Sequence, residues 1–135
     1  MATHFSTLMT RSSPASARRI EPRVLGELRR YGYSEEAIFA IRLALEEALA
    51  NAIHHGNHGD ASKHIQVEYC IDGKQAVIRI RDEGEGFNRC VVPDPTCPEN
   101  LEKSSGRGIM LMEAFMSEVR WNDRGNQVEM VKRNE

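Results

Sequence analysis

Apolar residues recur along this 135-residue chain with two spacings, one typical of helices and one typical of strands. A long helix is predicted over 35–55, because its apolar residues fall on one side when each residue turns the helix by about 100°. Ser34 can cap the start of this helix, where two acidic residues suit the helix dipole. The predicted core face consists of Ile38, Ile41, Leu45, Leu49 and Ala52.

Strict alternation of apolar and polar residues predicts two pairs of strands after this helix. Residues 65–71 and 76–81 alternate in this way on either side of Asp72-Gly73, which is a hairpin turn sequence. Residues 119–122 and 128–132 form a second alternating pair around another turn. Two hairpins are therefore expected to supply most of a sheet.

Two shorter helices and an N-terminal segment complete the predicted elements. The helices are expected over about 16–31 and 109–116, and a short strand or loose arm over 4–9. These elements predict an α/β two-layer sandwich, in which a mixed, mainly antiparallel sheet is covered on one face by helices. The other sheet face is expected to be solvated or used for a partner. The length suits one domain over 1–135, and the proline-rich segment 88–105 is expected to be a lid or binding loop.

The composition and charge of the chain argue against nucleic acid and membranes as partners. Hydrophobic residues make up 40% and charged residues 28% of the chain, which is usual for globular proteins. The formal net charge of −2 provides no broad cationic field for nucleic acid. No apolar run reaches the roughly 18 residues that span a bilayer, and the N-terminus has no signal-peptide pattern, so a cytoplasmic location without membrane contact is expected.

Three groups of polar residues and glycines lie at the ends of predicted elements. Glu47 and Asn51 lie opposite the core face of the long helix, whereas Glu46 points about 100° away from Glu47. A strand-end carboxylate can accept a hydrogen bond from an exocyclic amine, glycines let the backbone approach a ligand, and a helix start presents amides to an anion. Together the groups predict a nucleotide site. Its other members are Asp82, Gly84 and Gly86 after one strand and Gly106, Arg107 and Gly108 before the last helix.

Each group has an ordinary alternative when it is taken alone. A Glu and an Asn four residues apart are commonly exposed helix residues, and Asp-x-Gly-x-Gly is commonly a hairpin or bulge. Neither glycine group resembles the Walker phosphate loop or the dinucleotide fingerprint. The histidines at 54–64 have no regular companion ligands for zinc. The occurrence of all three groups in one chain favours nucleotide binding, with Asn51 able to place an oxygen on Mg²⁺ and Glu47 able to take a proton.

Three segments of the chain resemble the boxes of the GHKL superfamily of ATP-binding domains (gyrase, heat-shock chaperone, histidine kinase, MutL). They are residues 45–56, 81–87 and 106–112, in the same order and with similar spacing. Within that superfamily the chain is most similar to the bacterial anti-sigma factor serine kinases. The resemblance implies that Asn51 binds Mg²⁺, Glu47 is the general base and Asp82 bonds the adenine amino group.

The resemblance also implies further contacts with ATP. His55 matches the histidine of the family, and the glycines of the second and third boxes would shape the pocket and the lid. Lys103 or Arg107, near the end of the lid, would reach the phosphates, although exposed lid charges are commonly only solvated. Gln127 stands where the superfamily usually has a threonine after the glycine of the last hairpin.

The function implied by the resemblance is that of an ATP-dependent protein serine kinase. Members of that branch phosphorylate a serine on an antagonist protein and sequester a sigma factor, which makes them partner-switching regulators. Because the 135-residue sequence shows neither the dimerisation and phospho-acceptor helix of histidine kinases nor the transducer domain of gyrase or MutL, the stand-alone serine-kinase branch is expected. Homodimerisation is a further expectation. The alternatives are a catalytically inactive ATP-binding regulatory module and a fragment of a sensor kinase.

Overall fold

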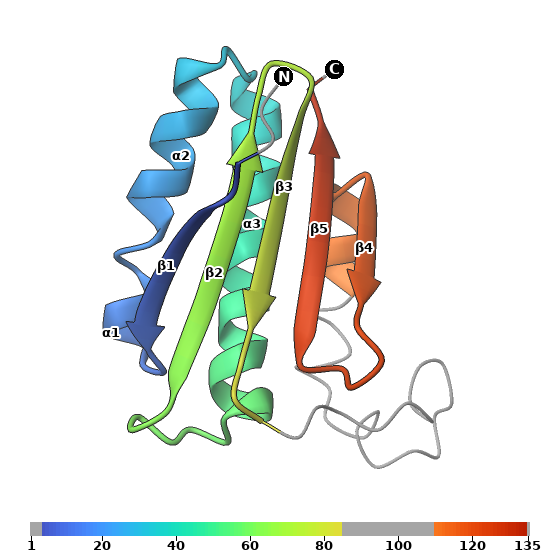
Figure 1. The fold of residues 1–135 in the computed structure, drawn as a ribbon. Helices are drawn as coiled ribbons and strands as arrows, with labels where there is room; N and C mark the ends of the chain where they lie inside the picture. The colour runs from blue at the N-terminus through green and yellow to red at the C-terminus, as the bar shows by residue number, and fades with distance from the viewer. Residues whose placement is uncertain (1–3, 85–109, 135) are drawn as a thin grey trace.

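The computed structural model describes residues 4–84 and 110–134, and it contains a five-stranded sheet backed by helices (Figure 1). The strand order is β1-β2-β3-β5-β4. All four neighbouring pairs in this sheet are antiparallel, so the described strands show no mixed character. The strands are β1 (Ser6–Arg11), β2 (His64–Ile71), β3 (Gln75–Arg81), β4 (Glu118–Trp121) and β5 (Gln127–Arg133).

The helices lie on one face of the sheet, as predicted. Ser34 caps the long helix, because its Oγ accepts a hydrogen bond from Ala37 N at 3.1 Å. Residues 110–115 are also helical and lie behind β4 and β5 (Figure 1). The remaining elements are α1 (Pro14–Ala17), α2 (Glu21–Arg30), α3 (Glu35–Asn51) and the π-helical turn η1 (Ala52–Gly56).

The single helix predicted over 16–31 is wrong, since two helices occupy this region. Pro22 lies in the first turn of α2. Proline has no amide hydrogen to donate to a carbonyl four residues earlier, so it starts a helix readily but does not continue one. α1 therefore ends at Ala17, and α2 begins as a separate helix at Glu21.

The core lies between α3 and the facing side of the sheet. All five residues of the predicted core face are buried, and Ile41 and Leu45 are fully so. Alternate residues of β2 and β3 complete the core, as the alternation in the sequence predicted. The opposite face of the sheet is polar: Arg79 Nε lies 2.7 Å from Glu129 Oε2, and the Arg79 guanidinium lies over the ring of Phe5.

No helix in the described residues is long and apolar enough to cross a membrane.

Candidate nucleotide-binding site

Three of the predicted site segments meet at one end of the sheet. α3 and β3 both end there, and β5 begins there (Figure 1). Because β3 and β5 are antiparallel neighbours, the last residue of β3, Arg81, pairs with the first residue of β5, Gln127. This topology places Asn51, Asp82 and the start of β5 in one region, although they are far apart in the sequence.

The end of α3 widens into the π-helical turn η1. Asn57 N donates to Ala52 O at 2.8 Å, five residues earlier, and Gly59 N donates to Ile53 O at 2.8 Å. His58 and Gly59 then take positive φ angles of 52° and 73°. The helical segment therefore ends within one residue of the predicted end at 55, and π-helical turns of this kind are frequent at functional sites.

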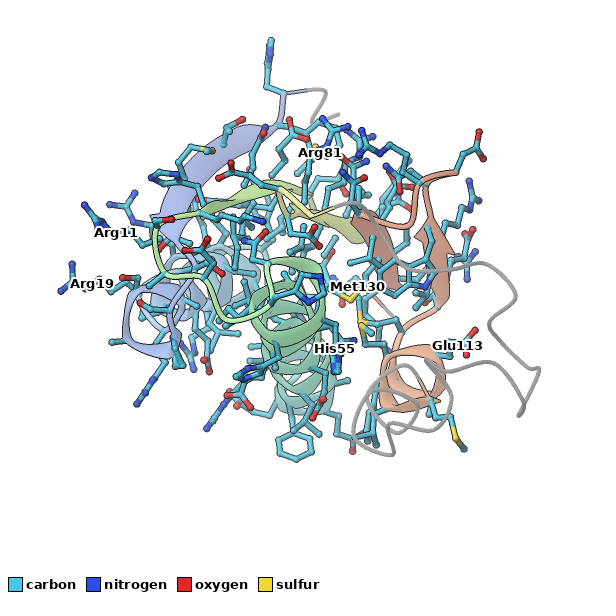
Figure 2. The ribbon with its side chains drawn as sticks, turned by 90° about the horizontal axis from the view of Figure 1, so that it is seen from below. Arg11, Arg19, His55, Arg81, Glu113 and Met130 are labelled. Carbon is cyan, nitrogen blue, oxygen red and sulfur yellow. The ribbon has the colours of Figure 1, made fainter. Side chains whose placement is uncertain are left out.

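The side chain of Asp82 lies on the helix side of the sheet. It follows Ile78 and Ile80, which are buried on that side, at the same two-residue spacing. Figure 2 shows Arg81 on the opposite side of the sheet from His55 and from the buried Met130. The carboxylate of Asp82 therefore faces the end of α3.

The Asp82 carboxylate is partly buried, and one of its oxygens is already bonded. Oδ1 accepts a hydrogen bond from Gly84 N at 2.8 Å. Burial raises the pKa of Asp82, and this effect outweighs the Gly84 hydrogen bond and the charges of His58 and Lys63, which lower it. A carboxylate in such a place retains capacity to accept a hydrogen bond from an amine.

Two glycines form a close contact between η1 and the turn after β3. A Cβ atom at Gly84 would lie 1.9 Å from Gly56 O, and one at Gly56 would lie 2.1 Å from Asp82 Oδ2. Gly84 must therefore be glycine for the two backbones to pack, whereas a side chain at Gly56 would displace the Asp82 carboxylate. Gly84 was predicted to shape the nucleotide pocket, and the structure gives it a packing role against Gly56.

Glu46 and Glu47 lie in different surroundings. Glu46 is exposed, and its Oε2 lies 3.4 Å from Nε of Arg42, which also pairs with Glu21 of α2. Glu47 is half-buried one helical turn before Asn51. His55 is half-buried within η1, whereas His54 is exposed.

The Asn51 side chain has a polar atom without a partner. Its Nδ2 is buried and makes no hydrogen bond within residues 4–84 and 110–134. A buried amide without a partner is costly, and rotation of the amide by 180° would present an oxygen in the same place. The side chain is therefore suited to a ligand, either as a donor or as an oxygen ligand to a hard cation.

The last hairpin contributes Asn126 to the helix side, where Gln127 was expected. Gln127 pairs with Arg81 and so lies on the opposite face from the Asp82 carboxylate. Asn126 is 7% exposed, and its backbone oxygen accepts a hydrogen bond from Asp82 N at 3.0 Å. Asn122 holds it in place, donating to Asn126 Oδ1 at 2.7 Å. The signal for Asn126 in the sequence is its position directly after Gly125.

Several predicted contacts lie outside the described residues and stay predictions. They include the predicted lid over 88–105 and the residues Gly86, Lys103, Gly106, Arg107 and Gly108.

Comparison with known proteins gives one family for nearly the whole chain. A family model described as the histidine kinase-like ATPase domain matches residues 10–132. The predicted α/β sandwich of the GHKL ATPase type is confirmed by this match and by the antiparallel sheet with its helical layer.

Two curated relatives indicate the branch of the family. The serine-protein kinase RsbW of Oceanobacillus iheyensis is 32% identical over 105 residues, which cover 73% of this chain and 66% of that protein. The anti-sigma F factor of Anoxybacillus flavithermus is 35% identical over 98 residues, which cover 68% of this chain and 66% of that protein. The chain thus matches about two thirds of the length of each relative.

A solved structure has the same fold. It contains the RsbU and RsbW domains of Rv1364c from Mycobacterium tuberculosis, and the TM-score is 0.65. The likeness covers 98% of this chain and 32% of the solved one, at 18% sequence identity, and at that identity it speaks for the fold alone.

Proposed function

This chain belongs to the histidine kinase-like ATPase domain family, and on that premise we propose that it is an ATP-dependent protein serine kinase acting as an anti-sigma or partner-switching factor. The names of the two curated relatives support this branch. The observation that carries the proposal is the meeting of Asn51, Asp82 and the Gly56–Gly84 contact at one end of the sheet.

Asp82 would recognise the base of the nucleotide. Its Oδ1 is held by Gly84 N, and its backbone N is held by Asn126 O, so the carboxylate has a fixed direction. A carboxylate accepts hydrogen bonds and favours the exocyclic amine of adenine, whereas guanine would present a carbonyl oxygen there. Asp82 therefore favours ATP over GTP.

Asn51 and Glu47 would serve the phosphate end of the nucleotide. The unpartnered amide of Asn51 fits Mg²⁺, which accepts amide oxygens and would neutralise phosphate charge when bound. Glu47 lies four residues earlier on the same helix, about 6 Å along its axis, and its side chain is partly exposed. Its carboxylate can take the proton from a serine hydroxyl as the serine oxygen bonds to the γ-phosphorus, the bond from that phosphorus to the β–γ bridging oxygen breaks and ADP leaves.

The protein partners follow from the proposed branch. The substrate would be an antagonist protein with an accessible serine, and the regulated partner a sigma factor. A kinase that uses ATP and binds such partners would act in the cytoplasm, and it would do so as a homodimer.

A phosphotransfer assay tests the proposal with two neighbouring glutamates. The protein is incubated with Mg²⁺, γ-labelled ATP and a candidate antagonist, and the label on serine is measured. We expect transfer with the wild type and with Glu46→Gln, because Glu46 faces Arg42. We expect Glu47→Gln to bind ATP normally but to lose at least about a hundredfold in transfer, the usual contribution of a general base.

Two outcomes would contradict this account. Normal transfer by Glu47→Gln would remove Glu47 from the role of base. ATP binding without any transfer by the wild type would favour a regulatory module that binds ATP without catalysis.

A further inference from the structure

Asn57 is a fully buried polar residue that has no part in the site described so far. It follows η1 directly, and it is 0% exposed. Its Nδ2 donates to His64 O at 3.1 Å, and its Oδ1 accepts from Glu83 N at 2.9 Å. One side chain thus connects the end of the helix, the start of β2 and the turn after β3.

The hydrogen bond from Glu83 N to Asn57 Oδ1 completes a series of three bonded backbone N–H groups around Asp82. Asp82 N is bonded to Asn126 O, and Gly84 N is bonded to the Asp82 carboxylate itself. Glu83 N lies between them and is bonded to Asn57 Oδ1. Without that oxygen, a backbone N–H next to Asp82 loses its partner. The peptide plane between residues 82 and 83 is then held only through its neighbours and through the Glu83 carboxylate, which accepts a hydrogen bond from His64 N.

Movement of that peptide plane would redirect the Asp82 side chain. The Cα of Asp82 is part of this peptide plane. Gly56 packs directly against the carboxylate, because a Cβ added at Gly56 would lie 2.1 Å from Asp82 Oδ2. Asn57 is the next residue after Gly56, so the same few residues fix both sides of the carboxylate. A hydrogen bond from a carboxylate to a ligand amine depends on such direction.

We propose that Asn57 is a positioning residue that fixes the Asp82 carboxylate and thereby sets the preference of the site for adenine over guanine. This inference rests on the proposed nucleotide site. Asn57 does not touch the nucleotide; it acts through Glu83 N and Asp82. A purely structural clamp would lower stability equally but would leave the preference between bases unchanged.

The test compares the binding of ATP and GTP by the full chain carrying Asn57→Ala. We expect the ratio of the Kd for GTP to the Kd for ATP to fall by about tenfold, which corresponds to one hydrogen bond of ordinary strength. Asn57→Asp keeps an oxygen facing Glu83 N but loses the donor to His64 O and buries a carboxyl group, so we expect lower stability together with most of the wild-type ratio. Folding of each variant is checked by thermal unfolding.

Tyr33→Phe is the matched control. The Tyr33 hydroxyl donates to Asp72 O at 2.8 Å, and it therefore holds the turn at the other end of the β2–β3 hairpin. This variant also loses one hydrogen bond to a turn, but far from Asp82. We expect lower stability and an unchanged ratio of the two Kd values.

Amide hydrogen exchange separates this inference from the proposed function. We expect Asn57→Ala to lose protection at Glu83 and Gly84 while the interior of β3 stays protected. If the wild type binds neither nucleotide, the proposed function fails, and exchange still decides whether Asn57 fixes the Asp82 turn. An unchanged Kd ratio or unchanged protection in a folded Asn57→Ala variant overturns the inference, as does unfolding of both Asn57 variants.

Discussion

At the scale of single residues, the most informative side chain is Asp82, because its burial has a consequence that is independent of any ligand. The pKa of Asp82 is raised above its ordinary value by burial. A carboxyl group with a raised pKa in the folded state stabilises the fold while it is protonated at low pH, and this contribution is lost as the pH rises through the raised pKa. The ionised carboxylate of Asp82 therefore lowers the free energy of unfolding at neutral pH.

Asp82→Asn should remove this destabilising effect of the buried charge, by an amount that depends on pH. Asparagine keeps an oxygen for Gly84 N but has no charge to bury. We expect the free energy of unfolding of the variant, relative to the wild type, to rise as the pH increases from 3 to 7. Urea unfolding at a series of pH values measures this difference. If the difference in the free energy of unfolding does not change with pH, burial of the Asp82 charge does not destabilise the fold.

At the scale of elements, the contact between η1 and the turn after β3 holds the site together. Gly84→Ala places a Cβ 1.9 Å from Gly56 O, so one of the two backbones must move. Strain of this kind costs about 1–3 kcal/mol in a packed region. We expect that loss in the free energy of unfolding, measured by urea unfolding, together with a loss of ATP binding.

Gly26→Ala is the matched control for the glycine contact. Gly26 lies within α2, and a Cβ there meets nothing within 4 Å. Alanine has a higher helix propensity than glycine, so we expect a gain of about 0.5–1 kcal/mol and unchanged ATP binding. Equal stability of the Gly84→Ala variant and the wild type would contradict the packing role of Gly84.

Most elements could be predicted from the sequence, and the errors have physical causes. The core face of α3, both hairpins and the cap at Ser34 depend on local periodicity and local hydrogen bonds, which a sequence displays. The division of α1 from α2 depends on Pro22, whose effect was overlooked. The π-helical form of η1 was not predicted, and the Asn57 side chain that follows it bonds Glu83, which lies 26 residues further along the chain.

The sequence indicated candidate residues for the site, but it did not indicate how they contact one another. Asp82 and Gly84 contact each other, and Asn51 ends α3 at the same end of the sheet, because each residue lies at the end of a predicted element. Gln127 was matched to the threonine of the superfamily through the resemblance alone, and a shift of one residue along a strand moves a side chain to the other face. Asn126 was missed for that reason. The contact between Gly56 and Gly84 joins two separate boxes, and no pattern within either box reveals it.

At the scale of the whole molecule, the strand order explains why a site forms at this end. β3 lies in the middle of the sheet, so its last residue is flanked by the start of β2 and the start of β5. α3 ends at the same end of the sheet, on its helical face (Figure 1). A carboxylate after a central strand is thus partly buried and surrounded by backbone groups, which suits selective binding of a base.

The central claim is that this end of the molecule binds ATP through Asp82. The most direct test is calorimetric titration of the wild type and of Asp82→Asn with ATP, with and without Mg²⁺. The account predicts magnesium-dependent binding by the wild type and at least about a tenfold weaker affinity for the variant, because a charge-assisted hydrogen bond is lost. Absence of binding at millimolar ATP, or equal affinity of the two proteins, would contradict the claim.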